Sequence, residues 1–308
     1  MQGSLRWRVI VICFFAQNLA MAMAFGTFGP MLASTEVHFG VSRGVAATGM
    51  GFIMLSIGAL SPVLGSLLQR IPVRLAMLAG ALVSSAGYWG LALVQSFKVA
   101  LLMYGLIGAG VCLLGILGPL VLINRWFATN RAKTLSLVNL PIALFLTPYI
   151  IAGVLPAYGR FTVLCVMGAA FLLMVPLLLS LVEHPVTVAN TTAIADKADI
   201  RDPEPNEGIG SILSNPAFWL VSLGIGVIAG AGTAFVVHIV PFGMDKAMSA
   251  HAASALLSVY SGCGIFGTLL LGWLADRIGP PTTLVIAAAV MAVLWWGLFR
   301  RVFVISSG

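Results

Sequence analysis

An all-α membrane protein is the fold class that this 308-residue sequence predicts, and three observations lead to it. Hydrophobic residues make up 60% of the chain and charged residues 8%, with a mean hydropathy of +1.07, whereas soluble domains are about 25% charged. Uncharged apolar runs of roughly 20 residues or more, the length that crosses a bilayer as a helix, recur along the chain. Basic residues stand singly in the short loops between them, so the net charge of +7 indicates membrane topology and no nucleic-acid partner.

The first part of the chain, residues 1–182, is predicted to form a six-helix bundle. A basic segment, Met1 to Arg8, precedes apolar runs at about 9–33, 45–68, 74–94, 98–123, 134–156 and 161–182. A signal peptide ending near Ala20-Met21-Ala22 is the alternative for the first run, but this run is far longer than the usual core of about 7–15 residues. Loops of only a few residues imply antiparallel neighbours in a bundle.

A polar segment separates two series of apolar runs. Residues 183–215 hold three prolines and six acidic residues against Lys197 and Arg201, which favours a flexible linker. Three further runs follow at about 217–240, 252–275 and 282–300. Residues 216–308 are therefore predicted to form an incomplete C-terminal bundle.

The Lys and Arg residues of the short loops predict the orientation. Eight of them lie on the side of the N-terminus and four on the other, a bias that Arg300 and Arg301 reduce to eight against six. The N-terminus and the linker are therefore expected in the cytoplasm, in a plasma membrane or a bacterial inner membrane. Nine spans would leave Gly308 outside.

A charged turn between the last two runs is the most informative motif. Its sequence is Gly272-Trp273-Leu274-Ala275-Asp276-Arg277-Ile278-Gly279-Pro280-Pro281. Gly279 suits a helix C-terminus and Pro280 the start of the next helix. Arg277 suits the negative end of a helix dipole, but Asp276 needs another partner. The turn resembles the G-x-x-x-D-R-x-G loop of the major facilitator superfamily, which occurs after the second and the eighth spans.

A weaker copy follows the second run, where the resemblance implies it. It runs from Gly65 to Arg74, with Gln69 in place of the usual Asp and Pro72 in place of the usual Gly. The superfamily is built as six plus six spans. The resemblance therefore implies that this chain lacks the last three, and we expect a truncated product or fragment that does not transport alone.

The two loop copies are predicted to act in gating on the cytoplasmic side. By the pseudo-symmetry of the family's fold, Asp276 is expected beside the start of the fifth span. That start carries Arg131, Lys133 and the positive end of a helix dipole. Because Gln69 is neutral, the contact in the first half that corresponds to the Asp276 pair is expected to be weak or absent. Arg70 would then act mainly as a topology anchor.

Several short motifs resemble one branch, the monocarboxylate transporters and oxalate:formate antiporters. They are Arg125-Trp126-Phe127 with the Arg-rich turn after it, Ser42-Arg43, Tyr158-Gly159-Arg160, and Tyr104 with the glycines after it. This resemblance implies alternating-access transport of a small organic acid. Members commonly place an Arg in the eighth span where this chain has Thr268, and the first span holds no base. A neutral or drug-like substrate, or a truncated non-transporting membrane protein, therefore remains open.

Polar groups inside the runs are the candidates for the substrate cavity. Gln17, Asn18 and Phe25 share one face of the first run, although the two amides could instead bond between helices. The remaining candidates are Tyr104, Asn139, Tyr260 and Thr268. His238 is a candidate for carrying a coupling proton, because histidine changes charge near neutral pH. An interfacial position near Pro241 is the alternative for it.

No enzyme is predicted. The serines lack a His/Asp pair, and no glycine-rich loop follows a strand. Cys13, Cys112, Cys165 and Cys263 lie inside apolar runs without metal-ligand spacing, and we interpret them as packing residues. No cofactor or metal is expected. The expected partners are the lipid bilayer, a small-molecule substrate and a coupling proton.

Overall fold

The computed structural model describes residues 2–127, 131–183 and 214–306, which form helices and loops with no β-strand among them. The predicted linker lies almost wholly outside the described residues. The chain divides into two compact units. We call residues 1–186 with 235–266 the larger unit, and residues 187–234 with 267–308 the smaller unit.

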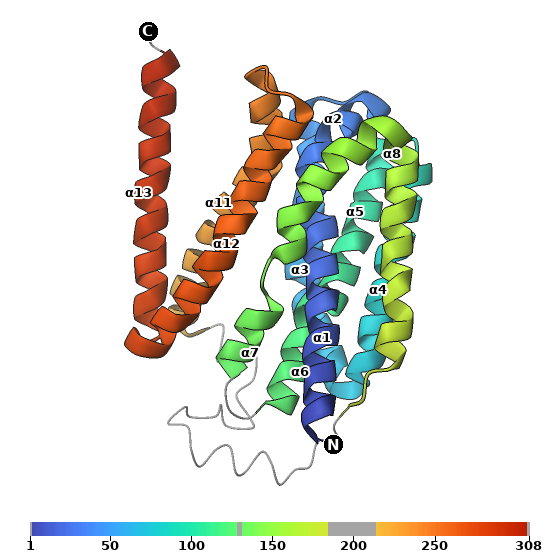
Figure 1. Ribbon diagram of the computed structural model, residues 1–308, viewed down its shortest axis with the longest axis vertical. Helices are drawn as coiled ribbons and strands as arrows, with labels where there is room; N and C mark the ends of the chain where they lie inside the picture. Colours follow the sequence, from blue (N-terminus) through green and yellow to red (C-terminus); the bar gives the residue numbers. More distant parts are fainter. Residues whose placement is uncertain (1, 128–130, 184–213, 307–308) are drawn as a thin grey trace. The chain divides into compact units, whose positions relative to one another are not determined.

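The larger unit begins with three predicted spans. The first is one long helix in three segments, and the next two are single helices (Figure 1): α1 (Gln2–Met21), η1 (Ala22–Gly26), α2 (Phe28–Phe39), α3 (Arg43–Arg70) and α4 (Val73–Leu93). The segment η1 is a π-helix, in which the backbone makes one wider turn. Gly40, with a φ of 61°, ends α2 in the left-handed conformation that favours glycine.

The next three spans complete the six predicted for the N-terminal part. Their segments are α5 (Phe97–Val111), the π-helix η2 (Cys112–Leu117), α6 (Gly118–Trp126), α7 (Arg131–Val138) and α8 (Ile142–Leu179). The helix α8 is two helices in sequence, because Gly159 has φ 74° and ψ 165°. That conformation is essentially restricted to glycine. The first part of α8 continues the fifth span, and the second part is the sixth.

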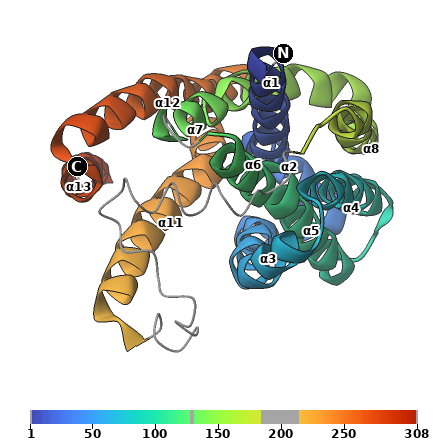
Figure 2. The same cartoon turned by 90° about the horizontal axis from the view of Figure 1, so that it is seen from below.

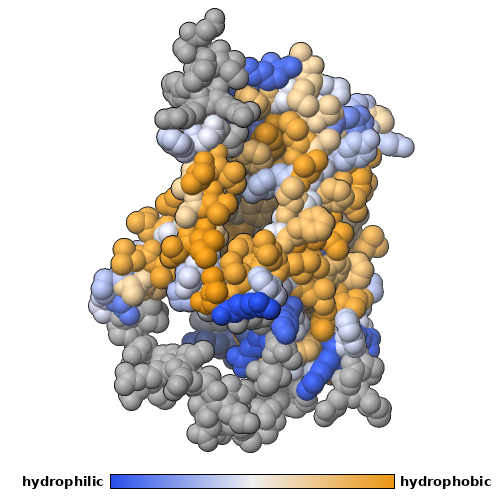
Figure 3. All heavy atoms as spheres, turned by 60° about the vertical axis from the view of Figure 1, so that its left-hand side comes forward, coloured by the Kyte–Doolittle hydropathy of each residue, from blue (hydrophilic) through white to orange (hydrophobic). Residues whose placement is uncertain are grey.

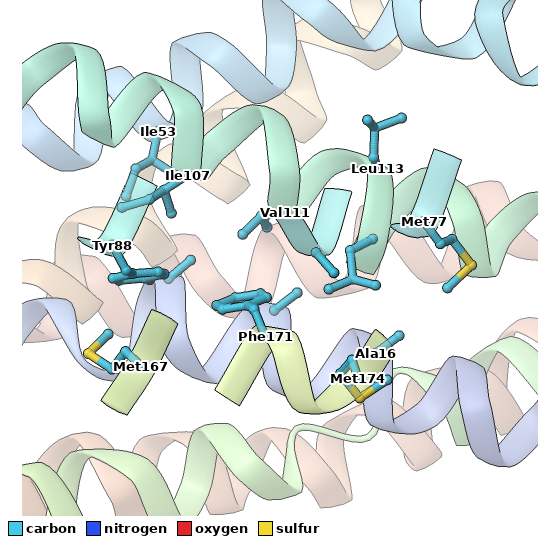
Figure 4. Close-up of a cluster of buried hydrophobic side chains, with 14 of the residues drawn as sticks. Ala16, Ile53, Met77, Tyr88, Ile107, Val111, Leu113, Met167, Phe171 and Met174 are labelled. Carbon is cyan, nitrogen blue, oxygen red and sulfur yellow. The ribbon is translucent and has the colours of Figure 1, made fainter. Parts of the chain in front are cut away.

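Small residues bring the helices of this bundle close together. Seen from below, α1 to α6 run roughly along the line of sight (Figure 2). A Cβ atom on Gly80 of α4 would lie 2.8 Å from the backbone oxygen of Gly110 in α5. In the core, Tyr88 stacks on Phe171 with ring centroids 5.6 Å apart (Figure 4). Such close backbone approach is how membrane helices associate without a hydrophobic driving force.

Three helices are described after residue 213, where three apolar runs are predicted: α11 (Pro216–Asp245), α12 (Ala250–Ile278) and α13 (Pro280–Ser306). The second half of α11 and the first half of α12 belong to the larger unit, and the rest to the smaller unit. These units do not follow the predicted division into 1–182, 183–215 and 216–308, which remains a prediction.

The lengths and surfaces of the described helices are those of a multi-pass membrane protein. Seven stretches are long and apolar enough to cross a bilayer, one of which, Lys133–Leu179, contains the two helices that Gly159 separates. Many large apolar side chains face outward, such as Leu102 (62% exposed) and Leu173 (78% exposed). Figure 3 shows hydrophobic side chains in a broad band, with hydrophilic ones gathered toward its upper and lower ends. The predicted all-α membrane fold is therefore confirmed.

Candidate functional site

Three spans of the larger unit are interrupted near their middles. The first and fourth contain η1 and η2, and the fifth breaks between α7 and α8. In both π-helices a glycine stands four residues before a proline, at Gly26 and Pro30 and at Gly115 and Pro119. Proline has no N–H to bond the carbonyl four residues earlier, so the regular ladder fails at these glycines. Such interruptions are frequent at functional sites of membrane and soluble proteins alike.

Asn18 joins the first span to the break in the fifth. Its Nδ2 donates to the Phe14 backbone oxygen at 3.1 Å, and its Oδ1 accepts from the Ala143 backbone N–H at 3.0 Å. The N–H of Ala143 lies in the first turn of α8, where no helical partner exists. Asn18 therefore caps another helix, an arrangement that matches the interhelical alternative given for it above.

The other candidates on this face of the first span lie at helix contacts. Gln17 is half-buried where α1 meets η2, since a Cβ on Gly115 would lie 3.7 Å from its Oε1. Phe25 is half-buried and packs both on the core of the bundle and on a small cluster from α11 and α12. That cluster, which we call the α11–α12 cluster, consists of Val236, Val240, Ala253 and Leu257.

The remaining cavity candidates are scattered. Asn139 is exposed in the break before α8. Tyr260 is 41% exposed and lies against Phe235, with ring centroids 4.7 Å apart. Thr268 is half-buried in the smaller unit. His238 is exposed on α11. Within the described part of the chain, no group of three or more His, Cys, Asp or Glu residues could hold a metal.

Tyr104 lies apart from the amides, in α5, with its ring centroid 5.8 Å from that of Phe28 in α2. The end of the larger unit where α2 joins α3 is the upper end in Figure 1. We call this the α2–α3 end. Tyr104 is 5% exposed and borders a cavity of about 20 Å³ that Arg160 also lines. Sequence reasoning placed Arg160 in a loop, as a topology signal and as part of the Tyr158-Gly159-Arg160 motif, and gave its side chain no part in a site. The backbone break at Gly159 starts a new helix at Arg160, and its side chain lines the cavity with Tyr88 and Tyr104.

An ion pair at the same α2–α3 end was missed by sequence reasoning. The Nη1 and Nη2 atoms of Arg43 donate to the carboxylate oxygens of Asp245 at 2.5 and 3.1 Å. Its Nε lies 3.5 Å from Glu36 Oε1. Arg43 is the first residue of α3 and Asp245 is the last residue of α11. Because they are 202 positions apart, no local sequence pattern predicts the pair. The bidentate arrangement is a geometrically specific form of ion pair.

The second half of α11 and the first half of α12 meet α2 and α8 at single close contacts. A Cβ on Gly29 would lie 3.0 Å from the Val236 backbone oxygen, and one on Gly153 would lie 3.1 Å from the His251 ring. The rings of Tyr149 and His251 are 5.1 Å apart. The ion pair and these contacts therefore join α11 and α12 to the first six spans.

The predicted gating residues of the first half lie at the opposite end. Gly65 is half-buried near the end of α3, where Gln69 and Arg70 are exposed. Arg131 Nε donates to the Phe127 backbone oxygen at 2.9 Å, and Lys133 is exposed.

The predicted gating residues of the second half lie in the smaller unit. Gly272 is half-buried, and the Arg277 guanidinium lies 4.4 Å from the centre of the Trp273 ring. The side chain of Asp276 lies outside the described residues, so its pairing with Arg131 and Lys133 remains a prediction.

Comparison with known proteins shows the family. Residues 13–307 match the sequence profile of the Major Facilitator Superfamily, so the chain belongs to this family of multi-pass membrane proteins. It is 25% identical over 280 residues to an "Oxalate:formate antiporter" of Oxalobacter formigenes, which covers 86% of this chain and 60% of that protein. It is also 25% identical over 286 residues to "Uncharacterized MFS-type transporter YcxA" of Bacillus subtilis (strain 168), with 89% and 66% covered. The resemblance drawn from the loop motifs is confirmed.

Proposed function

We propose that the protein is a secondary transporter that moves a small organic acid across the membrane by alternating access. The observation that carries the proposal is the match of residues 13–307 to a family of transporters. The organic acid is supported by the name of the antiporter of Oxalobacter formigenes, at 25% identity. The chain spans 60% and 66% of the lengths of the two relatives, so the activity and the substrate are proposals for the whole protein.

Transport into proteoliposomes tests this function. Vesicles holding the purified whole protein and preloaded with unlabelled oxalate, formate or lactate are expected to take up the labelled acid by counterflow, and vesicles without protein are not. The 308-residue chain reconstituted in parallel tests the expectation that it does not transport alone. If a neutral solute shows counterflow and none of the acids does, the substrate is that neutral solute and not an organic acid. Absence of all counterflow with the folded whole protein would favour a non-transporting role.

We further propose that the ion pair of Arg43 with Asp245 holds the α2–α3 end closed, and that this end faces outside. The outward orientation is supported by the excess of Lys and Arg in the loops of the opposite end. Alternating access requires that contacts closing one side break when that side opens, so removing them shifts the population toward the open state.

Accessibility of a buried position tests the role of this pair. In a background with the native cysteines replaced by alanine, Val240→Cys places a thiol at a site that is 1% exposed in the α11–α12 cluster. Arg43→Asp, which sets like charges together, is expected to speed its labelling by an impermeant maleimide from outside several-fold. Arg43→Asp combined with Asp245→Arg is expected to restore slow labelling, and Lys98→Asp, which reverses an exposed charge at the start of α5, to leave it unchanged. Equal labelling rates in the Val240→Cys protein and in the three variants built on it would refute the proposal.

A further inference from the structure

Arg160 carries a half-buried charge at the α2–α3 end of the first bundle. Its Nη2 donates to the Leu91 backbone oxygen at 3.2 Å, and its guanidinium lies 5.0 Å from the centre of the Phe39 ring. Its Nε is buried and has no hydrogen-bond partner. One donor of a charged group is therefore desolvated without compensation, which is costly in a low-dielectric interior.

The acidic side chains that the structure describes are all engaged elsewhere. Glu36 and Asp245 both bind Arg43. Glu183 accepts from the Arg74 backbone N–H at 2.6 Å, at the start of α4, whereas Leu91 stands near the end of that helix. At 1.5 Å per residue, these two points on α4 are roughly 25 Å apart. No described carboxylate therefore neutralises Arg160.

The backbone around Arg160 adds to the positive potential. Because Gly159 breaks α8, Arg160 is the first residue of the sixth-span helix, whose N-terminus carries partial positive charge. Basic residues are disfavoured there, and an anion is favoured. The C-terminal turn of α4, which supplies the Leu91 carbonyl, and the face of Phe39 offset only part of this charge.

The cavity beside Arg160 has the size and lining for a compact anion. Its volume of about 20 Å³ exceeds the roughly 10–15 Å³ that one water needs, but it is far too small for a dicarboxylate. Three hydroxyl-bearing side chains that are at most 5% exposed line it, which are Thr35, Tyr88 and Tyr104. Hydroxyl O–H and guanidinium N–H groups together form a donor set that can replace the water around a halide ion.

We propose that this pocket binds one chloride-sized anion against Arg160, within the N-terminal bundle and separate from the transported solute. The anion would neutralise the guanidinium and hold together the four spans that meet there through Phe39, Leu91, Tyr104 and Arg160. Binding to the folded chain only stabilises that fold in proportion to anion concentration. The inference does not depend on transport, so it can fail or hold independently of the proposed function.

Thermal unfolding of the purified 308-residue chain in detergent tests the site. At constant ionic strength, replacing gluconate by chloride or bromide is expected to raise the unfolding midpoint until the effect saturates, because gluconate is too large for the cavity. Arg160→Gln is expected to abolish the difference between the salts. Arg43→Gln, which removes an exposed arginine from the same end, is expected to retain it. Equal midpoints of the unsubstituted chain in chloride and gluconate would overturn the proposal, as would full chloride dependence in Arg160→Gln.

Direct binding of ³⁶Cl covers the case in which Arg160→Gln does not fold. The unsubstituted chain, shown to be monodisperse by gel filtration, is expected to bind one ion per chain. Tyr104→Phe keeps the ring and the arginine but removes one hydroxyl, and it is expected to raise the half-saturating chloride concentration up to about tenfold. Leu102→Phe, on the outward side of the same helix, is the matched control and should bind as the unsubstituted chain does. The absence of saturable binding, or unchanged affinity in Tyr104→Phe, would overturn the proposal.

Discussion

At the scale of single residues, Asn18 shows how one amide can serve a helix to which it does not belong. Pro141 ends any helical ladder before Ile142, so the first N–H groups of α8 need acceptors from elsewhere. Asn18 Oδ1 supplies one of them to Ala143 from the first span. In a membrane interior no water can take that place, which makes such a contact structurally important.

Substitution of Asn18 separates a structural from a substrate-binding role. Asn18→Leu keeps the volume but leaves the Ala143 N–H unpaired, so we expect the free energy of unfolding in mixed micelles to fall by about 1–3 kcal/mol. Asn18→Asp keeps an acceptor at the helix N-terminus and should cost clearly less. A fully stable Asn18→Leu protein that has lost solute binding would instead assign Asn18 to the cavity.

At the scale of elements, the first and fourth spans are not regular α-helices, because each contains a π-helical turn. The proline that follows each π-helix removes an N–H, but that alone does not produce the wide turn. The helix α3 has the same spacing of Gly58 and Pro62 and remains α-helical throughout. A Cβ on Gly26 would meet Leu144 and Thr147, and one on Gly115 would meet Ala20, whereas one on Gly58 would have no neighbouring atom within 4 Å.

Restoring the missing N–H tests this account of the π-helix. Pro30→Ala lets residue 30 donate to the Gly26 carbonyl, so we expect residues 22–26 to become regular α-helix and to exchange amide hydrogens more slowly. Pro62→Ala is the matched control and should leave exchange in the first span unchanged. Unaltered exchange in Pro30→Ala would show that helix packing alone maintains the wide turn.

At the scale of the whole molecule, the number of spans and the loop charges predict the orientation in the membrane. Six spans precede the predicted linker and three helices follow it among the described residues. If the N-terminus lies in the cytoplasm, as the loop charges predict, an odd number of spans would place residue 308 outside.

Two reporters fused after Gly308 test this orientation. Alkaline phosphatase, active only outside the cytoplasm, is expected to be active, and green fluorescent protein exported in unfolded form is expected to be dark. The same fusions after Val182, at the end of the sixth predicted span, should give the reverse pattern. A fluorescent fusion after Gly308 would mean that the number of spans is wrong.

The sequence alone determined the class of this protein, its spans and its family. Bilayer thickness sets the length of an apolar run, and the turn around Gly272 and Arg277 is a local motif, so both can be found without coordinates. The linker and the partner of Asp276 remain predictions. A local motif also predicted where the sixth span starts, although only the structure showed that Gly159 makes the break.

Only the tertiary structure decided which residues contact one another across the bundle and in which direction their side chains point. Arg43 and Asp245 meet over 202 positions, and Asn18 meets Ala143 over 125, distances at which no periodicity carries information. Sequence analysis placed Arg160 in a loop. It could not show that the side chain lines a cavity, because composition does not reveal which way a side chain points. Glycine and proline have the same spacing in three spans, but only two of these spans contain a π-helix. The sequence does not show which two, again because the neighbouring helices are not visible in it. A proline frees a carbonyl locally, but the neighbouring helices determine how the backbone responds.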